Sequence, residues 1–525
     1  MDYINLKISF RPLSYEVMRR YRLRVGGDHL DYDEKVFSPV ADEAIKDPVL
    51  FSLTAYRSWE EVPSWARGKI YACWPITPEG EYLKGVESAL SASRALRDIP
   101  MEDRIRALAD FKKVLMDEEE KWRELNHQEL HTDNVFRYEH EALSALFDEE
   151  NLRFQAELLR DRYTRGSLLK RVPYGVFGAV TPPNTSYSML TTVLQGAILS
   201  GNALVFKPPT KSALVAIEMA SRLEEHLMRY GFPHGLFNIV IGDSEKITDM
   251  WARHEYVHGV VFLGDAKTAR KVHEKFSSMS KKFIGESNGN DAVFIDKGWS
   301  ISELERIVRH AVDGRMVASG QFCIGVKRLF VHEELYEEVV EIAYDQAQRY
   351  KAGLVSDPET TLIPVSKIDK CQGWLSGLER DGGRKILGGY RMNYQNEPDE
   401  KGIFYAPTLV IDVSPANEIM NGEEIFAPIL PISKVGGVKE AVMAINRSPY
   451  RLKATIYSLD RGTIKYFCEG VKVGTVNVNV SHFTWNGGVF VGGRRDSSIT
   501  DRGVSIFAEL MTYPKMIHIG TSLNL

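Results

Sequence analysis

Hydrophobic and polar positions follow two different periods along this chain. Residues 86–160 carry apolar side chains three and four positions apart, as in "ALRDIPMEDRIRALADFKKVLMDEEEKW", and this spacing predicts successive amphipathic helices. From residue 172, short apolar runs predict strands: "YGVFGAV", "NALVFKP", "LFNIVIG", "GVVFLG" and "KKFIGE". Helical patterns over 211–230, 244–254 and 265–280 separate these runs. Strands buried on both faces and joined by helices are typical of a parallel, doubly wound sheet.

A second set of the same kind follows. The run "DAVFID", a helical pattern over 301–318, the run "KRLFVH" and a helical pattern over 333–350 repeat the alternation, and further α/β segments extend to about residue 480. The glycine-rich stretch "VSHFTWNGGVFVGGRRDSSITDRG" predicts loops, and "MTYPKMIHIG" predicts a final strand. The pattern as a whole predicts an α/β fold.

Length and charge narrow the class of protein. A chain of 525 residues exceeds what one hydrophobic core supports, so we expect two or three domains. The formal net charge of −5 provides no basic field for nonspecific binding of nucleic acid or acidic lipid, so neither is an expected partner.

The first residues, the lengths of the apolar runs and the cysteines indicate the cellular compartment. The start, "MDYINLKISF", lacks the basic segment and apolar core of a secretory signal, and no apolar run reaches the roughly 18 residues that span a bilayer. Cys73, Cys323, Cys371 and Cys468 are scattered without a CxxC spacing, so we expect neither a zinc site nor a disulfide framework. A reduced, cytoplasmic protein without a metal is the simplest interpretation.

Turns between strands and helices are the candidate nucleotide sites, because helix N-termini offer free N–H groups to phosphate. The glycine fingerprint GxGxxG is missing, since "DSEKI" follows "FNIVIG". In the turn "VFKPPTKSA", Lys207 ends a strand, and Thr210 and Lys211 open the next helix. An acidic side chain there would read the ribose of NAD and repel the phosphate of NADP, so its absence favours NADP. A lysine merely solvated at a strand end is the alternative interpretation.

The stretch "SGQFCIGVKR" raises the question of chemistry most directly. A free cysteine is usually a small buried hydrophobe, so Cys323 alone indicates nothing more. Other motifs in the chain change this interpretation. "GVFGAVTPPNTSY" resembles the segment of the aldehyde dehydrogenase superfamily that carries the oxyanion asparagine, which falls on Asn184. "KKFIGESNGNDAVFI" is similar to the segment with the general base, on Glu286, and "SGQFCIGVKRLFV" to the nucleophile segment, on Cys323.

Cofactor motifs of the same superfamily are also present, and the resemblance extends over roughly residues 100–520. "NALVFKPPT" resembles the ribose-binding strand end, with Lys207 at the family's lysine and Thr210 where NAD-preferring members usually carry Glu. "FLGDAKTA" places Gly264 and Asp265 near the cofactor diphosphate. "GEEIFAPILPI" resembles the motif at the nicotinamide ribose, which gives Glu424 and Phe426.

The resemblance implies a fold and an activity. The expected fold has two doubly wound parallel-sheet domains and a small β oligomerisation extension: residues 1–157 and 173–286 would bind cofactor, 287–490 would be catalytic, and 158–172 and 491–525 would form the extension. The expected reaction oxidises a small aldehyde with NADP, or with NAD, through a cysteine thiohemiacetal and a thioester that Glu286-activated water hydrolyses. The family also implies a homodimer or homotetramer.

Several positions depart from the family pattern and keep other hypotheses open. Pro183 stands where most members have Trp, and Asn288 and Gly289 stand where two glycines are usual. Asp265 replaces a small hydroxyl residue; beside a diphosphate it would weaken binding, whereas as a helix cap it would point elsewhere, and we favour the cap. A CoA-acylating member and a catalytically silent structural member of the fold are the alternatives.

Substrate residues are less well indicated. By analogy with the family, Phe322, Phe483 and Trp485 would wall an apolar aldehyde channel, and Arg494 or Arg495 would hold an anionic group of the substrate. The sequence assigns no role to residues 1–85.

Overall fold

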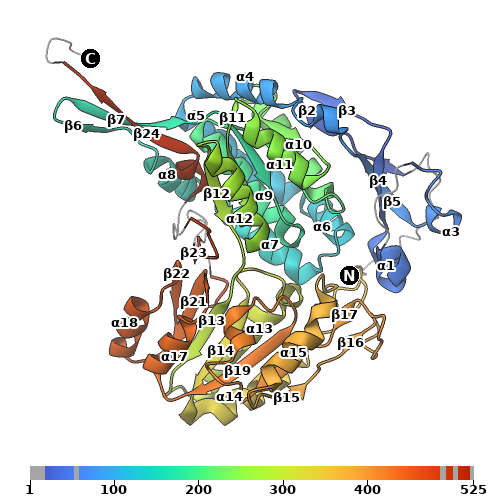
Figure 1. Ribbon diagram of the computed structural model, residues 1–525, viewed down its shortest axis with the longest axis vertical. Helices are drawn as coiled ribbons and strands as arrows, with labels where there is room; N and C mark the ends of the chain where they lie inside the picture. Colours follow the sequence, from blue (N-terminus) through green and yellow to red (C-terminus); the bar gives the residue numbers. More distant parts are fainter. Residues whose placement is uncertain (1–17, 53–57, 485–491, 501–505, 521–525) are drawn as a thin grey trace, which may run out of the picture.

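A computed structural model describes residues 18–52, 58–484, 492–500 and 506–520. The molecule has two lobes, each built on its own sheet, with an arm that projects from one of them (Figure 1). This arrangement confirms the predicted α/β fold with two largely parallel sheets.

The first sheet contains five parallel strands in the order β10-β9-β8-β11-β12. Its strands are β8 (Val176–Val180), β9 (Ala203–Lys207), β10 (Phe237–Ile239), β11 (Val257–Leu263) and β12 (Lys282–Glu286). The connecting helices are α10 (Leu214–Met228), α11 (Ser244–Arg253) and α12 (Ala266–Ser278), close to the predicted ranges. Because all strands run the same way, their carboxyl ends meet at one edge.

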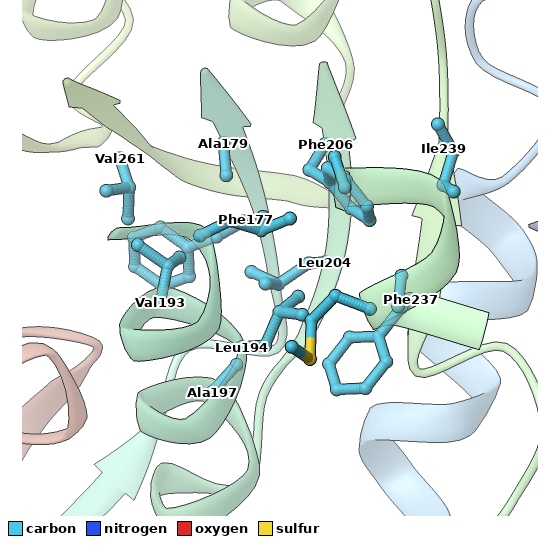
Figure 2. Packing of buried hydrophobic residues seen from close by; sticks show 14 of the residues in the cluster. Phe177, Ala179, Val193, Leu194, Ala197, Leu204, Phe206, Phe237, Ile239 and Val261 are labelled. Atoms are coloured by element: carbon cyan, nitrogen blue, oxygen red, sulfur yellow. The ribbon is translucent and has the colours of Figure 1, made fainter. Parts of the chain in front are cut away.

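A further helix, α9 (Ser186–Ser200), was not identified from the sequence. All of its side chains are buried except that of Met189, which is half-buried, so no polar face marks a helical period. Figure 2 shows why: Val193, Leu194 and Ala197 of α9 face Phe177 and Leu204 of the sheet, and all five are fully buried. The helix is therefore a core element of the first lobe.

The second sheet contains seven strands in the order β15-β18-β19-β14-β13-β21-β22, of which only β15 is antiparallel to its neighbour. Its strands are β13 (Asp291–Ile295), β14 (Val326–His332), β15 (Arg384–Leu387), β18 (Thr408–Ile411), β19 (Ile429–Val435), β21 (Lys453–Tyr457) and β22 (Thr475–Val478). Its helices include α13 (Ile301–Met316), α14 (Tyr336–Ala347), α15 (Cys371–Glu379), α17 (Val438–Ile445) and α18 (Arg461–Gly470). Two apolar clusters cover the two faces of this sheet.

The arm consists of β6 (Arg162–Thr164), β7 (Ser167–Pro173) and β24 (Thr512–His518). These strands pair antiparallel in the order β24-β7-β6, so the predicted final strand forms one edge. Every residue of β24 after Thr512 is exposed, and the arm extends well away from the body (Figure 1). The arm therefore has little core of its own.

Helices over the first lobe agree with the pattern of residues 86–160. They are α4 (Val86–Arg97), α5 (Met101–Asp117), α6 (Glu119–Gln128), α7 (Asp133–Leu146) and α8 (Glu149–Glu157). Their apolar faces join the core of the first sheet. None of the helices in the described part of the chain combines the length and apolar character needed to cross a membrane.

The N-terminal segment runs along one side of the first lobe, and α1 brings it to the edge of the second (Figure 1). It contains β1 (Arg19–Arg20), β2 (Leu23–Val25), β3 (Asp28–Leu30), β4 (Lys35–Pro39), α1 (Ala41–Lys46), α2 (Pro48–Ser52), α3 (Ser64–Arg67) and β5 (Ile70–Pro75). At one end, Trp74 Nε1 donates to the Thr210 carbonyl of the first lobe (3.1 Å). At the other, Ala41 and Ile45 pack in a cluster with Phe404 of the second lobe. The segment therefore connects the two lobes.

Candidate active site

One cavity of about 540 Å³ is lined by residues from both lobes. Seven of the ten predicted site residues line it. They are Asn184, Gly264, Asp265, Glu286, Cys323, Glu424 and Phe426. The remaining three, Lys207, Thr210 and Lys211, do not line it. Motifs far apart in the sequence thus meet around one space.

Cys323 lies in a tightly constrained loop between α13 and β14. The 3₁₀ turn before it, Val317–Gly320, includes three successive residues in the left-handed region, with φ of 53° at Ala318, 51° at Ser319 and 72° at Gly320. A Cβ on Gly320 would lie 2.4 Å from the Ala427 carbonyl oxygen, so only glycine fits there. Ser319 Oγ donates to the Ile363 carbonyl (2.7 Å) and fixes the turn. The cysteine is therefore held in place by its backbone.

Electrostatics keep the Cys323 side chain protonated. Burial, reinforced by the negative charges of Glu424, Glu286 and Asp291, raises the pKa of its thiol to about 12, against the opposing charge of Lys327. Near neutral pH the group is a thiol, so a reaction that uses it as a thiolate requires a base at hand.

Asn184 faces the cysteine loop. It lies in a short 3₁₀ turn, Pro183–Thr185, at the carboxyl end of β8, and its Nδ2 donates to the Gln321 carbonyl (2.7 Å). A side-chain amide has two N–H donors, so one remains for a ligand in the cavity. Gln321 in turn accepts at Oε1 from the backbone N–H of Ser366 (2.8 Å), which ties this side of the site to the following loop.

Two carboxylates, Glu139 buried and Glu129 half-buried, fix the start of α9 directly after Asn184, and the sequence analysis missed both. Glu139 Oε2 accepts from the backbone N–H of Ser188 (2.7 Å), and Glu129 Oε2 accepts from Ser186 Oγ (2.8 Å). Burial raises the pKa of Glu139 to about 7. Their positions in an amphipathic helical pattern gave no signal, because charged residues in such a pattern are normally solvated.

Glu286 is the last residue of β12 and is 9 % exposed. Its Oε2 accepts from the backbone N–H of Gly493 (3.2 Å), whereas Oε1 has no hydrogen-bond partner among the described residues. Burial raises the pKa of this carboxyl well above its usual value, and the charge of Asp291 adds to the shift. A buried carboxyl with an unpartnered oxygen beside a cysteine is suited to accept a proton.

Glu424 is surrounded by donors. Oε2 accepts from Asn288 Nδ2 (2.6 Å), and Oε1 accepts from the backbone N–H of Gly289 (3.2 Å) and lies 3.6 Å from Lys327 Nζ. Burial nevertheless raises its pKa above the usual value, because it outweighs these contacts. Lys327 Nζ also lies 5.0 Å from the ring centre of Phe426, so the acid, the cation and the ring form one group.

The unusual pair Asn288 and Gly289 has a structural reason. Asn288 Oδ1 accepts from the backbone N–H of Ala266 (2.7 Å), so its side chain bridges the start of α12 to Glu424. A Cβ on Gly289 would lie 1.9 Å from the Cys323 carbonyl oxygen, so this glycine lets the two loops touch. The sequence marked Asn288 as a departure but gave no indication of this bridge.

Asp265 is the N-cap of α12, which confirms the capping role but not the expected direction away from the cofactor site. Its Oδ1 accepts from the backbone N–H of Thr268 (3.0 Å). Burial on its own raises the pKa of this carboxyl, but the hydrogen bonds of Thr268 and the charge of Lys367 outweigh it and lower the pKa. Asp265 still lines the cavity. Lys367, whose Nζ lies 5.3 Å from the Phe426 ring centre, is the one Lys or Arg among the described lining residues.

Lys207, Thr210 and Lys211 lie at and after the end of β9. Lys207 is 6 % exposed, and burial lowers the pKa of its ammonium to about 8, against the opposing charge of Asp243. Thr210 is half-buried with its carbonyl bound to Trp74, and Lys211 is exposed. These residues form a separate cationic turn at the carboxyl edge of the first sheet.

Aromatic rings form a wall near the cysteine. Tyr138 lies 5.5 Å from Phe322 and 4.8 Å from Phe483, measured between ring centres. Trp485, the third predicted aromatic residue, lies outside the described residues. Arg494 and Arg495 form a short exposed strand and do not line the cavity. Within the described ranges, no three His, Cys, Asp or Glu side chains are grouped to hold a metal ion.

Comparison with known proteins decides the family. The family model described as "Aldehyde dehydrogenase family" matches residues 57–517. The chain belongs to the aldehyde dehydrogenase family. It is therefore an oxidoreductase that acts on aldehydes and uses a nicotinamide cofactor.

Individual relatives are distant. This aldehyde dehydrogenase is 27% identical over 357 residues to a lactaldehyde dehydrogenase of Methanococcus aeolicus, covering 67% of this chain and 73% of that protein. It is 29% identical over 314 residues to a D-glyceraldehyde dehydrogenase (NADP(+)) of Picrophilus torridus, covering 59% and 61%. A lactaldehyde dehydrogenase structure from Escherichia coli has a TM-score of 0.80 at 21% identity, covering 95% of this chain and 99% of that one, which shows the shared fold.

Proposed function

We propose that this enzyme oxidises an uncharged aldehyde to a carboxylic acid with NADP, through a thioester on Cys323 that water resolves. The observation that carries the proposal is the cavity in which Cys323, Asn184, Glu286 and Glu424 meet. Reduced nicotinamide, detected by its near-ultraviolet absorbance on mixing enzyme, NADP and a panel of aldehydes, tests it. No reduced cofactor with any aldehyde would overturn it.

The first half of the reaction builds an adduct on Cys323. Glu286 takes the thiol proton, because the thiol is otherwise protonated near neutral pH. Sγ then bonds to the carbonyl carbon, and the carbonyl electrons move onto oxygen. Asn184 and the backbone N–H of Cys323 donate to this oxyanion; the loss of one such donor typically costs about 100- to 1,000-fold in rate. A nicotinamide held by Glu424 and Phe426 would accept the hydride that leaves the adduct carbon, and re-formation of the carbonyl would leave a thioester on Cys323.

The second half frees the cysteine. Glu286 first releases its proton to solvent. It then takes a proton from water as the water oxygen attacks the thioester carbon. The carbon–sulfur bond breaks, the sulfur leaves as thiolate, and the acid departs. Retention of a carboxyl at this position favours water over CoA as the resolving group, although CoA remains the alternative acceptor.

The chain offers suitable contacts for a nicotinamide dinucleotide. The Thr181 hydroxyl, just past β8, is buried and without a hydrogen-bond partner among the described residues. Its backbone N–H donates to the Lys207 carbonyl (3.5 Å), so an unpartnered hydroxyl and a buried lysine come from adjacent strand ends at the sheet edge. Glu424 and Phe426 would hold the ribose at the cavity, and the start of α12 would face the diphosphate.

Uncharged substrates follow from the charges around the cavity. Its described lining carries the acids Glu129, Asp265, Glu286 and Glu424 but only Lys367 as a strong cation. A carboxylate or phosphate on the substrate would meet a net negative site. The relatives named lactaldehyde and D-glyceraldehyde dehydrogenase act on uncharged aldehydes by their names, which is consistent with this class.

NADP preference is tested at Thr210. In a Thr210→Glu variant, a carboxylate near the 2′-phosphate should lower the ratio of kcat/KM for NADP to that for NAD by about 100-fold. Steady-state kinetics with both cofactors measure the ratio. Thr210→Gln, similar in size but neutral, is the control and should keep it. An unchanged ratio in the Glu variant would contradict the proposed NADP turn.

Assembly is tested at the arm. We propose that β24 joins another copy of the chain, because an exposed edge strand that carries apolar residues is prone to pairing, and Met516 and Ile517 are 47 % and 37 % exposed. Ile517→Glu should shift the particle to a lower mass by size-exclusion chromatography with light scattering. Met443→Glu, the same kind of change at an exposed site on α17, should leave the mass unchanged. Equal masses for both variants would contradict this interface.

We also propose the division of the chain that the family implies: cofactor binding by residues 1–157 and 173–286, catalysis by 287–490, and oligomerisation by 158–172 and 491–525. Separate apolar clusters in the two lobes support it. The packing of α1 on the second lobe is one contact that crosses this division. A cytoplasmic location stays a prediction.

A further inference from the structure

Phe51 brings the N-terminal segment to the cavity wall. It lies on the short helix α2 and lines the cavity with residues that are far away in sequence. The preceding residue, Leu50, is fully buried in a cluster with Phe37 and Ile70 of the same segment. Asp47 Oδ1 accepts from the backbone N–H of Val49 (3.0 Å) at the start of α2. The helix is thus fixed from both sides, and Phe51 is a firm part of the wall.

Leu130 supplies a neighbouring part of the same wall under backbone strain. It follows α6 with φ of 68°, and the His131 N–H bonds back to the Asn126 carbonyl (3.0 Å), the pattern that ends many helices. Glycine is the ordinary residue at such a left-handed position, and leucine there strains the backbone. A bulky residue kept at this cost indicates that its side chain has a use.

Phe51 and Leu130 share one apolar neighbourhood in the fold. Both pack against the apolar cluster that includes Ala352, Leu362 and Phe404 of the second lobe, and both line the cavity. The Ala41 N–H at the start of α1 donates to Gln128 Oε1 at the end of α6 (3.1 Å), which ties the two supporting helices together.

Apolar residues dominate this end of the cavity. Ile363 directly follows Leu362 of that cluster and lines the cavity. It packs with Phe322 and Tyr138, which also line the cavity. The one imidazole at this end, His131, is neutral near pH 7, because burial lowers its pKa to about 4.

The Glu129 carboxylate at this end already has hydrogen-bond partners. Both oxygens of Glu129 are engaged, by Ser186 Oγ and by the Val215 N–H (3.0 Å). Lys367 and Phe426 stand together on the cofactor side. An aldehyde chain that extends from Cys323 toward Phe51 therefore meets hydrocarbon.

We propose that Phe51 and Leu130 close the substrate end of the cavity and limit the length of the aldehyde, so that the enzyme favours short, uncharged aldehydes. The inference rests on the proposed function and adds the determinant of chain length. It assigns the N-terminal segment, through α2, a role in specificity.

The test compares kcat/KM over a series of straight-chain aldehydes, from two to ten carbons, with saturating NADP. Phe51→Ala opens the wall, and each further methylene that it lets in should raise kcat/KM about fourfold. For chains two or more carbons beyond the optimum of the unaltered enzyme, the ratio to acetaldehyde should rise at least about tenfold. Val49→Ala, on the same helix at a site 59 % exposed, is the matched control and should leave the ratio unchanged.

The Leu130→Gly variant distinguishes an opened cavity wall from a folding defect. Glycine suits the left-handed backbone, so the variant should shift the series in the same direction without a fall in the midpoint of thermal unfolding. A uniform loss across all chain lengths, or an unchanged ratio in both variants, would overturn the proposal.

A second measurement separates this proposal from the proposed function. If the unaltered enzyme oxidises no aldehyde of the series, the proposed function fails and the wall is tested by binding alone. Unreactive alkyl amides of the same lengths are then titrated calorimetrically. Phe51→Ala should gain affinity for the longer amides relative to the shorter ones, and equal gains at all lengths would refute the wall.

Discussion

Replacing Cys323 by alanine is expected to lower kcat for aldehyde oxidation by at least about 10⁴-fold, because Cys323 is the one thiol among the described lining residues of the cavity. Cofactor binding, followed by the thermal shift that NADP induces, should be retained, since Cys323 makes no predicted contact to the dinucleotide. Cys468→Ala is the matched control: this cysteine is exposed on α18, and its loss should leave kcat unchanged.

The environment of Cys323 adds a pH dependence to this result. Burial and three nearby carboxyls raise the pKa of its thiol to about 12, so the free enzyme holds little thiolate at neutral pH. Alkylation of Cys323 by iodoacetamide, followed by peptide mass spectrometry without cofactor, should therefore accelerate continuously from pH 7 to 10. A plateau below pH 8 would show that the thiol ionises far more easily than its surroundings indicate. Substantial turnover by Cys323→Ala would reject the covalent mechanism itself.

Sequence patterns predicted the strands well and the buried helix poorly. Runs such as "KKFIGE" gave β12 because both faces of a parallel sheet are buried. The helix α9 escaped notice for the same reason: an element buried on all sides has no polar face, so its period is invisible. A short buried apolar run can therefore be recognised as a strand, whereas a helix that is buried on all sides shows no period in the sequence.

At the site, motif order predicted residues that meet in one cavity, whereas the side chains that support them could not be predicted. Asn288 was identified only as a departure from the family's glycine pair, yet it bridges Glu424 and the start of α12. Phe51 and Leu130 lie in different segments and reach the cavity only through tertiary packing. Neither kind of contact leaves a local pattern in the sequence, because both partners are distant along the chain.

The Glu286→Gln variant is expected to stop after one turnover. Glutamine keeps the shape of the side chain and removes its basicity, so resolution of the thioester should slow by about 100- to 10,000-fold. A rapid mix with NADP and aldehyde should then release about one reduced cofactor per Cys323 and nearly cease, and intact-protein mass spectrometry should find the acyl group on the enzyme. Glu255→Gln, at an exposed carboxyl, is the control and should turn over normally.

Lowering the pH should slow thioester resolution by the unaltered enzyme, as the Glu286→Gln substitution does. Burial raises the pKa of Glu286 well above its usual value, and only the carboxylate is a base, so thioester resolution should fall as the pH drops through that raised pKa. For folding the sign is opposite. A carboxyl with a raised pKa in the folded protein stabilises it fully below the unfolded pKa, and this contribution is lost as the pH rises. Glu286→Gln should therefore flatten both the rate profile and the decline of the unfolding midpoint above pH 5.

CoA separates the two ways of resolving the thioester. If water is the acceptor, adding CoA to the stalled Glu286→Gln variant should leave it stalled. The other carboxylates among the described lining residues already accept hydrogen bonds, so none is free to activate an incoming thiol. If CoA is the acceptor, the same addition should restore continuous production of reduced cofactor and release an acyl thioester, detectable by mass. Unimpaired steady turnover of the Gln variant without CoA would exclude Glu286 as the base in either case.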